Sequence, residues 1–161
     1  LGRRWGIGLA QEKFHAWFGR GTVADRDVIL LKPTTFMNRS GQAVQATGRF
    51  YQLELSDLLV ISDDLALPLG RLRFRARGGA GGHNGLQDIV DRLGGTEFPR
   101  LRLGIDSPVG DPAAFVLSRF GEADEAVVER ACSRAADGVE YWVEHGTESA
   151  MNRCNADPQA E

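Results

Sequence analysis

Two short stretches in which arginines alternate with apolar residues most constrain the fold of this chain. In residues 71–77, RLRFRAR, apolar side chains at positions 72, 74 and 76 alternate with arginines, and residues 100–105, RLRLGI, repeat the pattern. Because successive side chains of a β-strand point to opposite faces, the alternation predicts two strands, each with one apolar and one basic face. The apolar faces must be buried against other elements.

Other stretches predict further strands and helices. Residues 12–23 and 26–33 predict a β-hairpin, because the two extended segments are joined by the turn-forming ADRD. Residues 58–64, LLVISDD, predict a strand buried on both faces that ends in two carboxylates. Helices are expected at 38–53, capped by Asn38 or Ser40, and at 86–93, 122–144 and 148–155. This mixture indicates an α/β or α+β sandwich.

Charge is unevenly distributed along a chain whose net charge is −3. Residues 1–105 hold 15 basic and 10 acidic residues, whereas residues 106–161 hold 4 and 12. Because polyanion binding depends on local charge rather than on the sum, the basic part is where a phosphate-bearing ligand is expected. No window approaches the ~18 apolar residues of a membrane span, and the first residues lack the apolar region of a signal peptide. We therefore expect a cytoplasmic protein without a membrane partner.

The stretch from Arg75 to Asp88, RARGGAGGHNGLQD, joins a basic strand to an amphipathic helix. It contains neither GxGxxG nor GxxxxGK[ST], which argues against the common nucleotide-binding loops. Its glycines permit close approach of a ligand, and the helix start that follows favours anions. The alternative is a flexible connection in which His83 or Asn84 only caps the helix. Together with the carboxylates that end residues 58–64 and the asparagine of TTFMNRSG, the loop suggests a polar site for hydrolysis or recognition.

Three stretches resemble the bacterial peptidyl-tRNA hydrolase family: LLKPTTFMNRSGQAV, LLVISDDLALPLGRLRFRARGGAGGHNGLQDI and FPRLRLGI. The resemblance implies an α/β fold, a single domain over residues 1–161 with a mixed, twisted sheet between helices. It also implies hydrolysis of the ester that joins a peptide to the 3′ ribose of a transfer RNA, which frees the tRNA for translation. We expect a monomer that uses neither a metal nor a cofactor, with peptidyl-tRNA as its partner.

The resemblance assigns roles to eight residues. The family's catalytic aspartate, which orients and polarises a histidine base, falls on Asp63. Its motif asparagines fall on Asn38 and Asn84, whose side chains can orient the ester or its water by hydrogen bonds. The remaining assignments are Phe36 and Met37 in the groove for the terminal adenosine and peptide, His83 beside Asn84, and Arg75 and Arg102 in a phosphate clamp.

The family's N-terminal motifs have no match in this sequence. The resemblance implies an apolar first strand, a GLGNPG-like turn and an RHNxG-like segment that carries the histidine base, and none occurs in residues 1–161. His15 and His145 do not match the motif position. We therefore expect an N-terminally truncated domain, with an inactive chain as one outcome. The alternative function is a noncatalytic RNA-binding relative of the same fold, although Asp63, Asn38 and Asn84 together favour the hydrolase.

Overall fold

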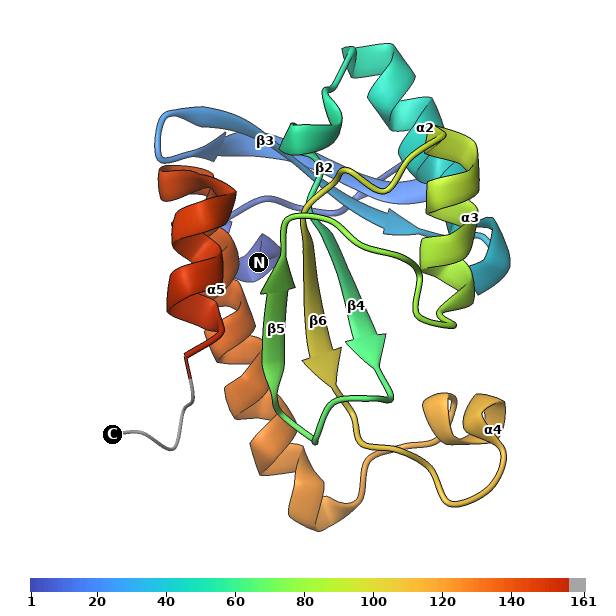
Figure 1. The fold of residues 1–161 in the computed structure, drawn as a ribbon. Helices are drawn as coiled ribbons and strands as arrows, with labels where there is room; N and C mark the ends of the chain where they lie inside the picture. Colours follow the sequence, from blue (N-terminus) through green and yellow to red (C-terminus); the bar gives the residue numbers. More distant parts are fainter. Residues whose placement is uncertain (157–161) are drawn as a thin grey trace. The chain divides into compact units, whose positions relative to one another are not determined.

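The structure, a computed structural model, describes residues 1–156. Contacts between residues divide the chain into two units, one formed by Leu1–Leu58 and Arg77–Phe98, the other by Leu59–Ala76 and the chain from Pro99 onward. Each unit combines a three-stranded sheet with helices (Figure 1). The expected mixture of strands and helices is therefore present, with the described strands divided between two sheets.

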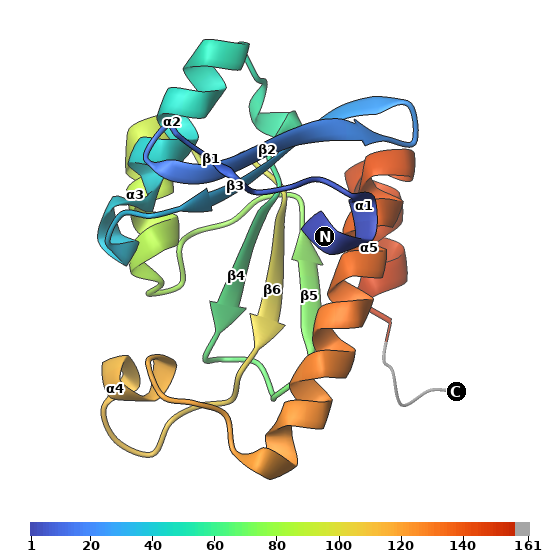
Figure 2. The same cartoon turned by 180° about the vertical axis from the view of Figure 1, so that it is seen from behind.

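The sheet of the first unit is antiparallel, with the order β1 (Gln11–Lys13), β2 (Ala16–Val23) and β3 (Arg26–Pro33) (Figure 2). Residues 24 and 25 form the turn between β2 and β3 with φ of 47° and 58°, so the predicted hairpin is confirmed. Residues 14 and 15 form a second tight turn, with φ of 58° each. The sequence did not predict this turn, because phenylalanine and histidine rarely adopt positive φ.

Helices complete the first unit. The short helix α1 (Gly2–Trp5) precedes the sheet, the 3-10 turn η1 (Met37–Arg39) leads into α2 (Ser40–Tyr51), and the 3-10 turn η2 (Leu55–Asp57) follows it. Helix α3 (Asn84–Leu93) contacts α2. Each of these two helices buries a stripe of apolar side chains, made of Ala43, Val44, Leu86 and Ile89.

The start of α2 differs from the prediction. Neither expected cap is used: Asn38 lies in η1, and Ser40 is the first helical residue, with a hydroxyl that donates to the Met37 carbonyl at 2.9 Å. The prediction was wrong because the η1 turn places the helix start beyond Asn38. At α3, the cap is His83.

The sheet of the second unit is mixed, with the order β4 (Val60–Asp64), β6 (Arg100–Gly104) and β5 (Leu72–Arg75). Strand β4 runs parallel to β6, and β5 runs antiparallel to it. The predicted alternation is confirmed on β5, where positions 72 and 74 are buried. The expected burial of β4 on both faces was wrong, because β4 is an edge strand among the described strands and Ile61 is 44% exposed.

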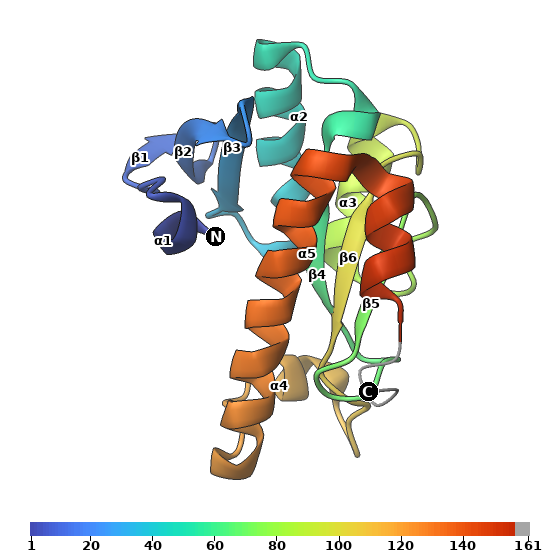
Figure 3. The same cartoon turned by 90° about the vertical axis from the view of Figure 1, so that its left-hand side faces the viewer.

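Helix α5 (Glu122–Cys154) contacts β5 along the sheet of the second unit (Figure 3). It breaks at Gly146, whose φ of 79° is not helical, and the two segments agree with the predicted helices at 122–144 and 148–155. A short helix, α4 (Pro112–Val116), was not predicted. The buried stripe of α5 consists of Ala131, Ala135, Val139 and Val143. In residues 1–156 no helix has both the length and the apolar character needed to cross a bilayer.

Candidate active site

The segment before α2 displays three of the predicted site residues at the surface. Phe36 is 79% exposed and Met37 55% exposed, and Asn38 is exposed beside them. The η1 turn that holds them is closed by the Arg39 N–H, which donates to the Phe36 carbonyl at 2.9 Å. Large exposed apolar side chains next to an amide are typical of a surface that contacts a ligand.

The glycine loop ends in a helix start whose cap is a histidine. His83 Nδ1 accepts hydrogen bonds from the backbone N–H groups of Gly85 at 3.1 Å and Leu86 at 3.2 Å. A ring nitrogen that accepts carries no proton, so the proton of the neutral ring lies on Nε2. Asn84 is the first residue of α3 and is exposed. The loop therefore caps α3 through His83 and leaves the Asn84 side chain exposed.

Close packing brings the η1 segment to the start of α3. A Cβ on Gly85 would lie 2.6 Å from Met37 Sδ, so the glycine lets the flexible Met37 side chain approach the start of α3 this closely. The structure thus brings together five predicted residues in the first unit: Phe36, Met37, Asn38, His83 and Asn84.

The second unit contains the two carboxylates that end β4. Asp64 is 7% exposed, and its Oδ2 lies 2.7 Å from Arg102 Nε as an ion pair, without the alignment of a hydrogen bond. Its Oδ1 accepts from the Ala66 N–H at 2.9 Å. Asp63 is half-buried and in register with Leu103, so its side chain lies on the sheet face opposite to that of Asp64 and Arg102. The predicted catalytic aspartate and the predicted clamp residue Arg102 are therefore on different faces.

The arginines of β5 and β6 share one sheet face. The register pairs Arg73 with Arg102 and Arg75 with Arg100. Arg100 is only 2% exposed, and burial, together with the charge of Arg102, lowers the pKa of its guanidinium. Part of the basic face is therefore buried, which the alternating pattern could not show.

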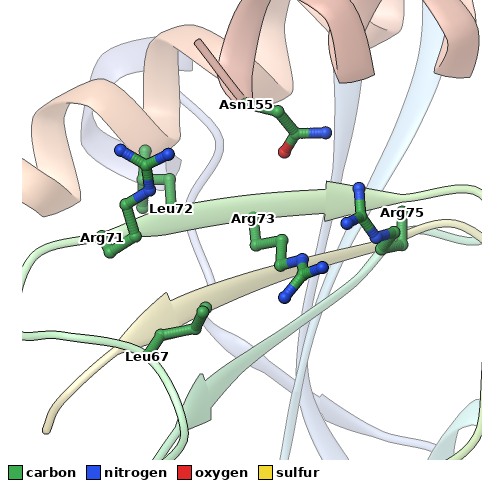
Figure 4. Close-up of a pocket in the computed structure, with 6 residues that line it drawn as sticks. All are labelled: Leu67, Arg71, Leu72, Arg73, Arg75 and Asn155. Carbon is green, nitrogen blue, oxygen red and sulfur yellow. The ribbon is translucent and has the colours of Figure 1, made fainter. Parts of the chain in front are cut away.

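A pocket of about 200 Å³ lies along β5 and is lined by the arginines at 71, 73 and 75, together with Leu67, Leu72 and Asn155 (Figure 4). Arg75 and Arg102 lie on the same sheet face without being direct cross-strand neighbours. Among residues 1–156 there is no group of three or more His, Cys, Asp or Glu side chains that could hold a metal ion.

Comparison with known proteins identifies the fold and then the family. A crystal structure of peptidyl-tRNA hydrolase from Acinetobacter baumannii matches with a TM-score of 0.90 and 38% identity over 96% of this chain and 80% of that one. The fold is therefore the α/β fold of peptidyl-tRNA hydrolase structures. The family profile described as peptidyl-tRNA hydrolase matches residues 1–161. The chain belongs to the bacterial-type peptidyl-tRNA hydrolase family.

Relatives with this name share close to half of their aligned residues with the chain. The peptidyl-tRNA hydrolase of Synechococcus sp. (strain JA-2-3B'a(2-13)) is 48% identical over 158 residues, which cover 96% of this chain and 70% of the relative. That of Chloroflexus aggregans is 47% identical, covering 96% of this chain and 84% of the relative. The family match lends no support to the expected loss of an N-terminal segment.

Proposed function

We propose that this chain hydrolyses the ester bond between a peptide and the 3′ ribose of a tRNA, releasing the peptide and a tRNA that can re-enter translation. One observation carries the proposal: a chain that matches the hydrolase family over residues 1–161 exposes both motif asparagines, Asn38 and Asn84, beside Phe36 and Met37. We further propose that it acts in the cytoplasm as a monomer.

Asn38, Asn84 and Asp63 have different roles in the proposed hydrolysis. Water adds to the ester carbonyl and the bond to the ribose 3′ oxygen breaks. One proton of the water goes to that oxygen, and the other is released to solvent as the peptide leaves as a carboxylate. The amides of Asn38 and Asn84 donate hydrogen bonds to the substrate ester or hold the attacking water. Asp63 orients a histidine base rather than acting as one, as the resemblance to the family implies.

The general base is not one of the three histidines of residues 1–161. His83 Nδ1 accepts two backbone N–H groups as the cap of α3, so this nitrogen is already engaged in holding the helix start. His15 lies in an exposed turn, and His145 Nε2 lies 3.4 Å from Glu144 on α5. Neither of these two matches the family's RHNxG-like position. We therefore assign the general base to a histidine of an RHNxG-like segment, as the resemblance implies.

Phosphates of the tRNA are the proposed ligands of Arg75 and Arg102. Both side chains lie on the basic face of the second sheet, where cations attract the RNA backbone. The ion pair with Asp64 holds Arg102 in place and offsets its charge. We therefore expect Arg75 to contribute the larger part of the attraction to phosphate.

The test is release of an N-acetylated amino acid from N-acetyl-aminoacyl-tRNA at excess protein. We expect release above the rate of a buffer control and a large loss of that release in Asn38→Ala and Asn84→Ala. The matched control is Asn152→Ala, which removes an exposed asparagine of α5 and should leave the rate unchanged. Binding of tRNA without any release would instead favour the noncatalytic RNA-binding relative.

A further inference from the structure

We propose that Asp88 is a positioning residue of the hydrolytic site, which fixes the segment carrying Asn38 against the helix carrying Asn84. The inference rests on the proposed function of these two asparagines. Asp88 lies on α3, inside the second of the family-like stretches, and the resemblance assigns no role to it.

The start of α2 takes its hydrogen-bond acceptor from another helix. The first N–H groups of a helix have no partner within it and are usually satisfied by the side chain of the N-cap residue. Arg39, the N-cap of α2, makes no such bond. Instead the Gly41 N–H donates to Asp88 Oδ2 at 2.7 Å, across 47 residues of sequence. The carboxylate also places a negative charge at the positive end of α2.

The Asp88 carboxylate is also held in one orientation by the Arg92 side chain. Arg92 Nε lies 2.9 Å from Oδ1 and 3.1 Å from Oδ2, one turn further along α3. The Asp88 side chain is only 16% exposed, which limits screening of this ion pair by solvent. Because Arg92 holds the Asp88 carboxylate, this carboxylate can serve as a fixed acceptor for the Gly41 N–H.

At the point where α2 approaches α3, no residue larger than glycine fits at position 41. A Cβ on Gly41 would lie 2.5 Å from the Asp88 carbonyl oxygen and 2.8 Å from Arg92 Cδ. The hydrogen bond and the close contact together fix the start of α2 against the second turn of α3.

Both asparagines lie next to this contact. Asn38 precedes Gly41 by three residues, and Asn84 precedes Asp88 by about one helical turn. Loss of the Asp88 bond would let the η1 segment shift relative to the start of α3. Because a misplacement of about 1 Å can cost up to ~10²-fold in rate, such a shift should affect hydrolysis more than binding.

A second bond between the same helices supplies a matched control. Gln45 Nε2 donates to the Arg92 carbonyl at 2.6 Å, about one turn further along both helices. Gln45→Ala also removes an interhelical hydrogen bond, but at a point more distant from the asparagines. A general role in holding α2 to α3 would make the two substitutions equivalent.

The experiment measures single-turnover release of N-acetyl amino acid from N-acetyl-aminoacyl-tRNA, together with the Kd for deacylated tRNA. Asp88→Ala should lower the rate at saturating protein about 10-fold or more while leaving Kd unchanged, and Gln45→Ala should stay within about twofold of the unsubstituted chain. Asp88→Asn retains an acceptor oxygen and the side-chain volume, so it should fold and give an intermediate rate. An unchanged rate in Asp88→Ala, or equal losses in Asp88→Ala and Gln45→Ala, would overturn the inference.

Two further readouts separate positioning from folding and from failure of the proposed function. In an Asn38→Ala background, Asp88→Ala should cost about twofold or less, because its effect acts through the asparagine; an undiminished loss would contradict this. Hydrogen exchange of the Gly41 N–H should accelerate in Asp88→Ala and not in Gln45→Ala. The exchange result does not depend on hydrolysis. Absence of release even by a chain that also carries the RHNxG-like segment would therefore contradict the function, whereas unchanged exchange would contradict the role of Asp88.

Discussion

The His83 side chain has a structural role at the start of α3 that limits the chemistry of its Nδ1 atom. Its Nδ1 caps α3 by accepting from Gly85 and Leu86, and the same bonds exclude that nitrogen from proton transfer. Loss of an N-cap side chain typically costs about 1 kcal/mol, and asparagine is a good replacement cap. His83→Ala should therefore lower the free energy of unfolding by about 1 kcal/mol in urea denaturation, and His83→Asn should restore most of it.

The control for this prediction is His15→Ala, because His15 is exposed in the turn between β1 and β2. It should leave the free energy of unfolding nearly unchanged. If His83→Asn proves as unstable as His83→Ala, the imidazole ring is needed for packing rather than as a cap.

The two cysteines of α5 should differ in reactivity. Burial raises the pKa of the Cys154 thiol, and its sulfur lies so close to Gly138 that a Cβ there would be 2.6 Å away. Cys132 is exposed. Because the thiolate is the reactive form, a thiol reagent at pH 8 should label Cys132 at least ~10-fold faster than Cys154, as measured by peptide mass spectrometry. Equal labelling rates would contradict the burial of Cys154.

The raised pKa of Cys154 also sets the sign of its effect on stability. Because the folded chain favours the neutral thiol, Cys154 contributes to the free energy of unfolding at pH values below the ordinary thiol pKa. This contribution is lost as the pH rises through the higher value of the folded state.

Local motifs named candidate site residues, and they could not show which distant residues fix their positions. Phe36, Met37, Asn38 and Asn84 are exposed as expected of a binding surface. The partner of Asp88 is a backbone N–H 47 residues away, which leaves no trace in the sequence. The ion pair of Asp88 with Arg92 has the four-residue spacing that is typical of ion pairs on one helix face.

At the level of elements, the edge of β5 is closed by a side chain rather than by a strand. Asn155 Oδ1 accepts from the Phe74 N–H at 2.7 Å, and its Nδ2 donates to the Phe74 carbonyl at 3.0 Å. Figure 4 shows this side chain directed toward β5. The amide thereby makes the pair of bonds that a neighbouring strand would make.

Asn155→Ala should leave both backbone groups of Phe74 without these partners. We expect the free energy of unfolding to fall by about 1 to 3 kcal/mol, because buried polar groups without partners are costly. Urea denaturation compares this variant with Asn152→Ala, an exposed position of the same helix that should change little. Equal stabilities of the two variants would show that the Asn155 amide does not support the β5 edge.

Elements with a strong repeating pattern were predictable, and elements defined by tertiary contacts were not. The alternation in β5 and the periodicity of α2 and α5 gave the correct type of structure. The short helices α1 and α4 span four and five residues, too few to show a helical period. The exposure of Ile61 was missed because strand order within a sheet cannot be read from a strand's own composition.

At the level of the whole molecule, the excess of positive charge in residues 1–105 is outweighed by the excess of negative charge in residues 106–161. If Arg75 contacts a tRNA phosphate, Arg75→Ala should reduce the slope of log affinity against log salt by ~0.7 to 0.9. Arg102→Ala should reduce it less, because Asp64 already offsets that charge. Arg130→Ala on α5 is the control. Identical slopes in all three variants would reassign Arg75 to an ordinary solvated surface.

Hydrolysis in which Asp63 orients a histidine is tested most directly by one single-turnover measurement. The rate of peptide release is compared between residues 1–161 and the same chain extended ahead of Leu1 by the first strand and RHNxG-like segment of a relative, with and without Asp63→Asn. General-base assistance typically contributes ~10² to 10⁴-fold, so the extended chain should be at least ~100-fold faster. Asp63→Asn should remove most of that gain without changing the Kd for tRNA, because an amide cannot stabilise an imidazolium as a carboxylate does. Equal rates for the two lengths, or an extended chain indifferent to Asp63→Asn, would contradict this mechanism.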